Sequence, residues 1–308
     1  MQISTSYLFD RASQQMGKLQ TDLAKSHAQI SAQKQILNPS DAPDQSAAIL
    51  RLNSVMARQL SFSNSLNTIK TRLSTEDSTL TGASELIIRV KEISLQAGNA
   101  SINNNDRQAL GIELKSLRNQ LLSFANTQDS NGNYLFAGSR VTQPAFSMDE
   151  VTGQTVYQGD QTTMNVMIGE QHSIPINRSG SDAFVRVVRV GSDGTSSGVG
   201  FFQSLDDLTA AVNHSDLAGI QRGIGEVDSL HQGMTLAQAN VGTDMNVVEL
   251  QTTVIQDTTL NLKTNLSNLE DLDYTTAITQ MNKQLLALEA AQSSFAKISQ
   301  LSLFNYIK

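Results

Sequence analysis

The stretch LNSVMARQLSFSNSLNTIKTRLSTEDSTLTGASELIIRVKEISLQA, residues 52–97, decides the fold. It contains no proline, and positions spaced alternately three and four residues apart are apolar at 11 of 14 places. The three polar places are Gln59, Glu76 and Ser94. Such spacing puts the apolar side chains on one face of a continuous α-helix. The sequence therefore predicts a helix too long for an ordinary globular domain.

A second long helix is predicted in the other half of the chain. The same alternation runs from Leu230 to Thr276, where nine of 14 places are apolar. Two such stripes, one from each half, can cover each other as in a coiled coil. Residues 98–105 interrupt the first helix, and Asn105 or Asp106 is expected to cap a third helix that folds back on it.

Both ends of the chain carry weaker stripes of the same period, and a joint separates each end from the long helices. The N-terminal joint contains Pro39, Asp41 and Pro43. Pro39 disfavours helix at the residue before it, and Pro43 is tolerated only in a first helical turn. The C-terminal joint is a change of register by about two residues at Glu270 and Asp271, which locally unwinds a coiled coil.

The predicted helices and the joints between them indicate a mainly α fold. It is a long helical bundle or coiled-coil rod built from both chain halves, with a small β-rich insertion. We expect three domains, which are a terminal coiled-coil domain (1–44 and 273–308), a helical-bundle domain (45–138 and 200–272) and the insertion (139–199).

The insertion is predicted from glycines and short extended runs. Ten of the 19 glycines lie between Gly132 and Gly200. The runs 155–157, 163–168 and 184–190 are rich in β-branched residues, which favour strands. Asn131-Gly132 before residues 133–136 is typical of a hairpin turn.

The composition excludes several classes of function. The chain has 308 residues, a formal net charge of −7 and no cysteine. An acidic chain without basic runs is a poor nucleic-acid binder. The absence of cysteine excludes disulfide frameworks, zinc fingers and thiol nucleophiles. No apolar run has the length of a membrane helix, and no secretory signal peptide follows Met1. We therefore expect neither a nucleic acid nor a membrane as partner.

Motifs for catalysis and metal binding are weak. Residues 194–198 (GTSSG) match the G-x-S-x-G pattern, but that motif needs its serine in a sharp turn between a strand and a helix. Here it lies in a Gly/Ser tract, so a secreted hydrolase that uses Ser196 is only an alternative. Residues 129–133 resemble the start of a calcium loop with its glycine misplaced. The acids between Glu270 and Asp273 are expected on a solvated face. We expect no enzyme, cofactor or metal site.

The terminal stripes are where we expect contacts between molecules. Residues 1–37 and 274–308 provide only two helices, with Ser, Gln and Thr in their seam. Such a pair buries too little apolar surface to offset the ordering of the chain. We therefore predict that these segments are largely disordered in the free monomer and become helical when neighbouring subunits cover them.

Several segments resemble the flagellin superfamily, and the resemblance covers nearly the whole chain except the insertion. Within the superfamily, Asn126–Ser139 (NTQDSNGNYLFAGS) is similar to the proteins of the hook–filament junction, and it lacks the Phe-Asn-Gly pattern usual in filament flagellins. The other segments that carry the resemblance are Met1–Ser6, Asn38–Ala48 with its Pro-Ser-Asp joint, Asn105–Leu110, and Leu266–Asp271 through Leu301–Asn305.

The resemblance implies a structural, non-enzymatic role in the bacterial flagellum, as a ring that joins hook to filament. It implies other copies of the chain, hook-associated protein 1, flagellin and an export chaperone as partners. It also implies unfolded export through the flagellar type III apparatus to the cell exterior. Filament flagellin is the alternative within the superfamily.

The assembly contacts that the resemblance assigns are Leu19, Leu23, Ile30, Ile278, Met281, Leu285, Leu288 and Phe295. The predicted hinge residues are those of the two joints: Pro39, Asp41, Pro43, Glu270 and Asp271.

Overall fold

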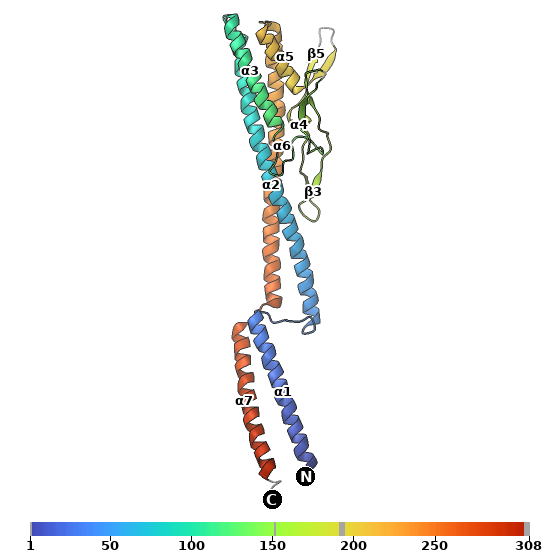
Figure 1. Ribbon diagram of the computed structural model, residues 1–308, viewed down its shortest axis with the longest axis vertical. Helices are drawn as coiled ribbons and strands as arrows, with labels where there is room; N and C mark the ends of the chain where they lie inside the picture. The colour runs from blue at the N-terminus through green and yellow to red at the C-terminus, as the bar shows by residue number, and fades with distance from the viewer. Residues whose placement is uncertain (1, 151, 191–194, 305–308) are drawn as a thin grey trace. The chain divides into compact units, whose positions relative to one another are not determined.

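The computed structural model describes residues 2–150, 152–190 and 195–304. The fold is mainly helical, with 69% of the residues in helices and a few small antiparallel sheets (Figure 1). The helices are α1 (Gln2–Ala32), α2 (Pro43–Ala97), α3 (Asn104–Ala125), α4 (Gly180–Ala183), α5 (Phe201–Asn213), α6 (Leu217–Glu270) and α7 (Tyr274–Phe304). The strands are β1 (Phe146–Met148), β2 (Thr155–Tyr157), β3 (Asn165–Met167), β4 (Ser173–Pro175), β5 (Val187–Val190) and β6 (Ser196–Val199).

The chain forms two compact units, each built from both halves of the sequence. The terminal unit consists of residues 1–58 and 257–308, and the central unit of residues 59–256. The boundaries between these units lie inside α2 and α6, and the β-rich insertion belongs to the central unit. The three-domain division, which places boundaries at the joints, stays a prediction.

The central unit is organised around the predicted seam of α2 and α6. The apolar seam residues of α2 from Leu66 onward are buried, and so are the three polar seam residues Gln59, Glu76 and Ser94. The matching buried positions of α6 are Leu230, Met234, Ala237, Val241, Val248 and Ile255. The two helices run antiparallel, since Gln238 donates a hydrogen bond to Thr81 at 3.2 Å and Lys91 pairs with Asp228. The spacing thus identified the buried face correctly.

Two helices complete this core, and the sequence predicted only one of them. α3 folds back along α2 as expected, but Asn103 caps it, accepting a hydrogen bond from the Asp106 N–H at 2.8 Å. The predicted caps, Asn105 and Asp106, were wrong because helical geometry already begins at Asn104. α5 was not predicted. Its buried face begins with Phe201 and Phe202.

The insertion contains three separate two-stranded antiparallel sheets: β1 with β2, β3 with β4, and β5 with β6. The run 155–157 coincides with β2, the run 163–168 contains β3, and the run 184–190 ends in β5. Strands β1, β4 and β6 were not predicted. Gly132 has a positive φ of 80°, as a turn requires. The expected hairpin, however, is reduced to one bridge between Gln128 and Tyr134.

Three arginines fasten the β region and α3 to the neighbouring helices. Arg118 makes two hydrogen bonds to Asp206 at 2.9 Å. Arg189 contacts both carboxylate oxygens of Glu226, at 2.7 and 2.8 Å. Planar, two-pronged contacts of this kind fix orientation as well as distance. The third, Arg178, reaches the α2–α6 seam.

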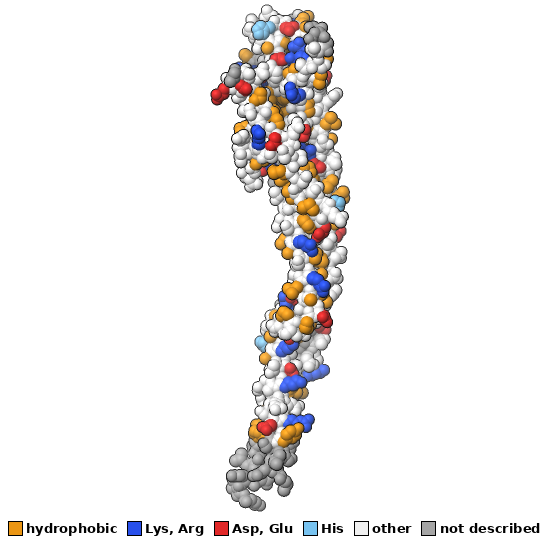
Figure 2. Space-filling model, turned by 90° about the vertical axis from the view of Figure 1, so that its right-hand side faces the viewer, with side chains coloured by type: hydrophobic (Ala, Val, Ile, Leu, Met, Phe, Trp, Pro, Cys, Tyr) orange, Lys and Arg blue, Asp and Glu red, His pale blue; other side chains and the backbone are white. Residues whose placement is uncertain are grey.

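Exposed apolar side chains on the face drawn in Figure 2 lie among uncharged polar ones, and charged groups are scattered. Among the described helices, none combines the length and apolar character needed to cross a membrane.

Candidate assembly interface

The terminal unit contains an antiparallel pair of helices, α1 and α7 (Figure 1). The rings of Phe9 and Phe295 lie 4.4 Å apart at one place, and the Tyr274 hydroxyl lies 3.5 Å from the Ile30 carbonyl at another. The inward positions alternate by three and four residues on both helices, as in a coiled coil. They are Ala12, Met16, Leu19, Leu23, Ser26 and Ile30 on α1, and Ala277, Met281, Gln284, Leu288, Ala291 and Phe295 on α7.

This seam is shallow and partly polar. Ser26 donates a 2.8 Å hydrogen bond to Gln284 across it. Among the side chains of α1 and α7 that the structure describes, Ser26 alone is buried. The apolar seam residues are only partly buried, because two helices cover only one side of each other. The α1–α7 pair therefore leaves part of its apolar surface exposed to solvent.

The predicted assembly residues divide into two groups. Six of the eight, Leu19, Leu23, Ile30, Met281, Leu288 and Phe295, lie on the seam within one molecule. The apolar period of a helix indicates that one of its faces is covered. It does not indicate whether the same chain or a neighbouring chain covers that face. Ile278 and Leu285 lie outside the seam and are 44% and 43% exposed. Leu286, 69% exposed, belongs with them and was missed because it departs from the three-and-four spacing.

The burial of apolar side chains differs sharply between the two units. Every buried apolar side chain among the described residues lies between Leu66 and Ile255, within the central unit. The central unit thus has a core of its own, whereas the described part of the terminal unit has none. Burial of apolar surface is the main favourable term in folding. The terminal helices therefore have much to gain from additional partners.

The N-terminal joint is a closed polar turn. The Asp41 carboxylate accepts a 2.8 Å bond from the Lys25 ammonium and a 3.2 Å bond from the Asn38 N–H. The Lys25 contact is the main reason that the pKa of Asp41 is lowered. Pro39 lies within this turn, and Pro43 is the first residue of α2, where no N–H is required.

The C-terminal joint is bonded to the segment that follows α1. Gln35 N–H donates to the Glu270 carbonyl at 2.9 Å, and Leu272 N–H donates to the Gln33 carbonyl at 3.1 Å. Lys34 forms an ion pair with Glu270 and a β-bridge with Asp271. Backbone hydrogen bonds thus connect the C-terminal joint to residues 33–35, just before the N-terminal joint, and the sequence did not predict them.

Of the acids of this joint, Asp271 and Asp273 are exposed, as expected, whereas Glu270 is partly buried. Glu270 is held by Lys34, and Asp273 caps α7. The Asp273 carboxylate accepts bonds from the N–H groups of Thr275 and Thr276, at 3.0 and 3.3 Å. It also accepts a 2.7 Å bond from the Thr276 hydroxyl, the main cause that lowers its pKa.

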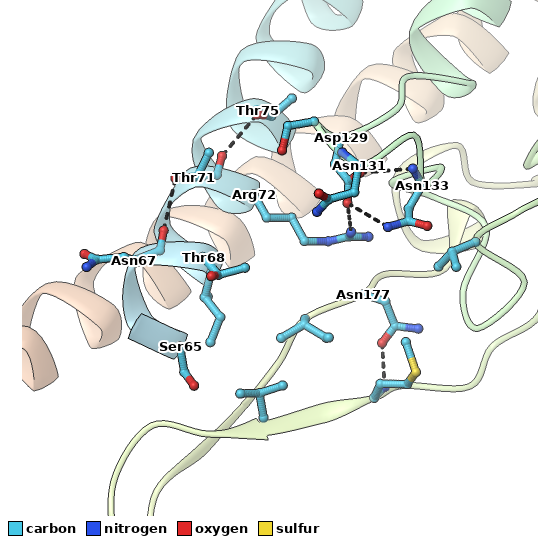
Figure 3. Close-up of a pocket in the computed structure, with 16 residues that line it drawn as sticks. Ser65, Asn67, Thr68, Thr71, Arg72, Thr75, Asp129, Asn131, Asn133 and Asn177 are labelled. Carbon is cyan, nitrogen blue, oxygen red and sulfur yellow. Dashed lines mark hydrogen bonds and ion pairs between the residues drawn. The ribbon is translucent and has the colours of Figure 1, made fainter. Parts of the chain in front are cut away.

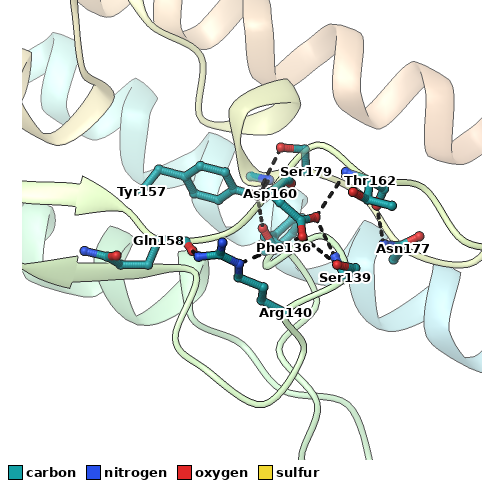
Figure 4. A network of polar contacts seen from close by, with 10 residues as sticks. Phe136, Ser139, Arg140, Tyr157, Gln158, Asp160, Thr162, Asn177 and Ser179 are labelled. Carbon is teal, nitrogen blue, oxygen red and sulfur yellow. Dashed lines mark hydrogen bonds and ion pairs between the residues drawn. The ribbon is translucent and has the colours of Figure 1, made fainter.

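The segment Asn126–Ser139 connects the helices to the insertion. Asn126 pairs with the backbone of Phe146 in both directions, at 2.8 and 2.9 Å. At the other end, Ser139 donates from its N–H and its hydroxyl to the Asp160 carboxylate, and the hydroxyl contact is the main reason that the pKa of Asp160 is lowered (Figure 4). The Tyr157 hydroxyl contacts the Phe136 carbonyl and Ser179 beside it. The polar residues of this segment therefore have a structural role, because their hydrogen bonds hold the segment against the insertion.

The structure does not give Ser196 the geometry of a catalytic serine. Ser196 is the first residue of strand β6, where it pairs with Val190. The following helix begins only at Phe201, whereas a nucleophile elbow places its serine directly between strand and helix. Gly194, the first glycine of the motif, lies outside the described residues.

The candidate calcium loop is a satisfied turn. Asp129 accepts hydrogen bonds from the N–H groups of Asn131 and Asn133. It also forms an ion pair with Arg72 at 3.0 Å. In the ranges that the structure describes, no group of three or more His, Asp or Glu side chains is placed to hold a metal ion.

Comparison with known proteins agrees with this geometry. Residues 3–141 match the family model described as the bacterial flagellin N-terminal helical region, and residues 224–307 match the C-terminal helical region. The chain is 25% identical to flagellar hook-associated protein 3 of Salmonella typhimurium over 99% of both chains. It is 26% identical to the protein of that name from Escherichia coli over the full length of both.

The fold is also found among solved structures. A putative flagellar hook-associated protein from Vibrio parahaemolyticus superimposes with a TM-score of 0.67 at 21% identity, covering 75% of this chain and all of that one. The two matched regions together span most of the sequence and include both the central seam and the terminal pair, and so the chain belongs to the bacterial flagellin family.

Proposed function

We propose that this chain is a structural adaptor of the bacterial flagellum that forms the junction between hook and filament. The family is one of structural flagellar proteins and not of enzymes. The two relatives called flagellar hook-associated protein 3 align with the chain from end to end. Filament flagellin remains the alternative within the family.

One observation carries the mechanism: the described part of the terminal unit contains no buried apolar side chain, whereas the central unit has a full core. In an assembled ring, the terminal helices of neighbouring subunits would cover the exposed residues Ile278, Leu285 and Leu286. In this proposal the chain is exported unfolded with a chaperone and then assembles next to hook-associated protein 1 and flagellin. Terminal helices whose apolar residues become buried only on assembly would suit this route.

The substitution Leu285→Asp tests the proposal. A carboxylate buried without a partner is costly, so the variant should be absent from purified flagella, as measured by immunoblot. Circular dichroism should show an intact central unit. Gln280→Asp introduces the same charge at an exposed polar position of α7 and serves as the matched control, which should assemble.

A strain that lacks the chain separates the two functions within the family. Electron microscopy should show hooks without filaments, with filament protein shed into the medium. A purified chain that grows long filaments unaided would instead identify a filament flagellin.

A monomer in dilute solution tests the coupling of folding to assembly. Hydrogen exchange in residues 7–32 should be fast. Slow exchange throughout this range would contradict the proposal that the terminal helices fold only on assembly.

A further inference from the structure

The outer side of α6 carries a second apolar stripe that faces solvent. It consists of Leu236, Val247, Leu250 and Val254, which are 43 to 69% exposed. Offsets of 11, 3 and 4 residues keep all four on one face of a helix with 3.6 residues per turn. Thr243 lies on the same face, and its hydroxyl donates a 2.9 Å hydrogen bond to the Ala239 carbonyl. This α6 stripe is therefore a continuous uncharged surface, unlike singly scattered apolar residues, which need no explanation.

The same unit has a groove between α2 and the insertion, with a volume of about 750 Å³. Figure 3 shows Ser65, Thr68 and Arg72 on the α2 wall and Asn177 on the opposite side. The insertion contributes apolar side chains to the lining: Val141, Met164, Val166 and Ile176. This α2 groove shares no residue with the α6 stripe.

Several polar groups of the groove already have partners within the chain. The hydroxyls of Thr68, Thr71 and Thr75 each donate to the carbonyl four residues earlier, at 3.0 to 3.1 Å. Arg72 is neutralised by Asp129, and both side chains are largely buried. Covering this wall would thus leave few unpaired donors, the main penalty of removing polar groups from water. The wall presents methyl groups that an apolar partner can contact.

The stripe and the groove lie at the same height along the central seam. Arg178 contacts both Glu76 of α2 and Asp244 of α6, which fixes the register of the antiparallel helices. Residues 65–75 of α2 are therefore level with about residues 245–255 of α6, which include most of the stripe. A neighbouring copy could insert its stripe without a large axial shift.

We propose that the α6 stripe of one subunit docks into the α2 groove of the next copy of the same chain. The inference rests on the proposed function, which supplies neighbouring copies. Both surfaces lack net charge, which matters because each chain carries a net charge of −7 and copies repel each other. Different surfaces meet on the two copies, so the contact is head-to-tail, the arrangement that generates rings when the rotation closes.

Cysteine cross-linking in assembled flagella tests the docking, and the natural chain contains no cysteine to interfere. The double variant Leu250→Cys/Thr71→Cys should give a ladder of dimers and larger oligomers on oxidation. Each single variant should give none. The pair Thr71→Cys/Ile112→Cys, with Ile112 exposed on α3, is the matched control and should also stay monomeric.

Two results would overturn the docking: dimers from Leu250→Cys alone, which would mean that two stripes face each other, or no ladder in a double variant present in the flagella. The pair Val254→Cys/Thr68→Cys repeats the measurement one turn away. Immunoblotting of wild-type flagella scores incorporation separately. Absence of the wild-type chain would refute the proposed function, whereas its presence without cross-links refutes only the docking.

Discussion

Glu76 occupies a seam position of α2 where an apolar residue is normal, and its replacement by Gln gives a prediction that can be worked through. The side chain is only 4% exposed, and burial raises its pKa from 4.5 to about 7, against the opposing effect of Arg178 2.7 Å away. The folded chain therefore holds this proton more tightly than the unfolded chain does. The contribution of Glu76 to the free energy of unfolding is therefore greatest below about pH 4.5 and decreases as the pH rises towards 7.

The magnitude follows from the two pKa values. A difference of one pKa unit corresponds to about 1.4 kcal/mol, so the full effect is about 3 kcal/mol. Between pH 5 and pH 8, wild type should lose about 2–3 kcal/mol relative to Glu76→Gln, which cannot ionise. Comparison with the variant cancels the other titrating groups, because both proteins share them.

Hydrogen exchange measured by mass spectrometry gives the opening free energy of peptides from residues 66–90 at both pH values. Glu85→Gln, at an exposed site on the same helix, measures what loss of a surface carboxylate does. A wild type that gains stability over Glu76→Gln as the pH rises would refute the reasoning, since the ion pair with Arg178 would then outweigh burial.

Four further substitutions address three separate features. Gly138→Ala should destabilise the insertion by about 1–3 kcal/mol in thermal unfolding, because Gly138 has a φ of +65° and a Cβ there would lie 2.3 Å from the Asp160 carbonyl oxygen. Asp273→Ala should speed hydrogen exchange in the first turn of α7, and wild type should show the same loss as the pH falls below the lowered pKa of Asp273, where the cap is protonated. Leu230→Ala should cost about 2–5 kcal/mol in urea unfolding, whereas Leu236→Ala, at an exposed site, should change stability by less than about 0.5 kcal/mol.

The long helices could be predicted from the sequence because their signal repeats. In α2 the three-and-four spacing identified the buried face, including Glu76 and Ser94, whose polarity argues against burial. The 55 residues of α2 make about 15 turns, which supply many independent positions, so single exceptions do not obscure the period.

The short elements could not be predicted in the same way. Strands of three or four residues, such as β4 and β6, carry too few positions for a period of two, and their pairing partners decide them. β6 contains Gly198 in a Gly/Ser tract that reads as a loop, yet it pairs with the β-branched strand β5.

The candidate interface was predictable in part. Leu23 and Met281, predicted as assembly contacts, lie on the seam within one molecule. A seam within one molecule and a seam between molecules leave the same pattern in a sequence, so their role between molecules stays a prediction. The bonds from residues 33–35 to the C-terminal joint, such as that from Gln35 to Glu270, join backbone groups, and these do not depend on residue type.

The pairing of α1 with α7 also has a consequence for biosynthesis. The residues that meet, such as Ser26 and Gln284, are 258 positions apart. On the ribosome, α1 emerges first and has no partner until nearly the entire polypeptide has been made. Closure of so large a loop is slow, because its entropy is lost before any contact forms. The central core can form during this delay, before α1 and α7 have paired.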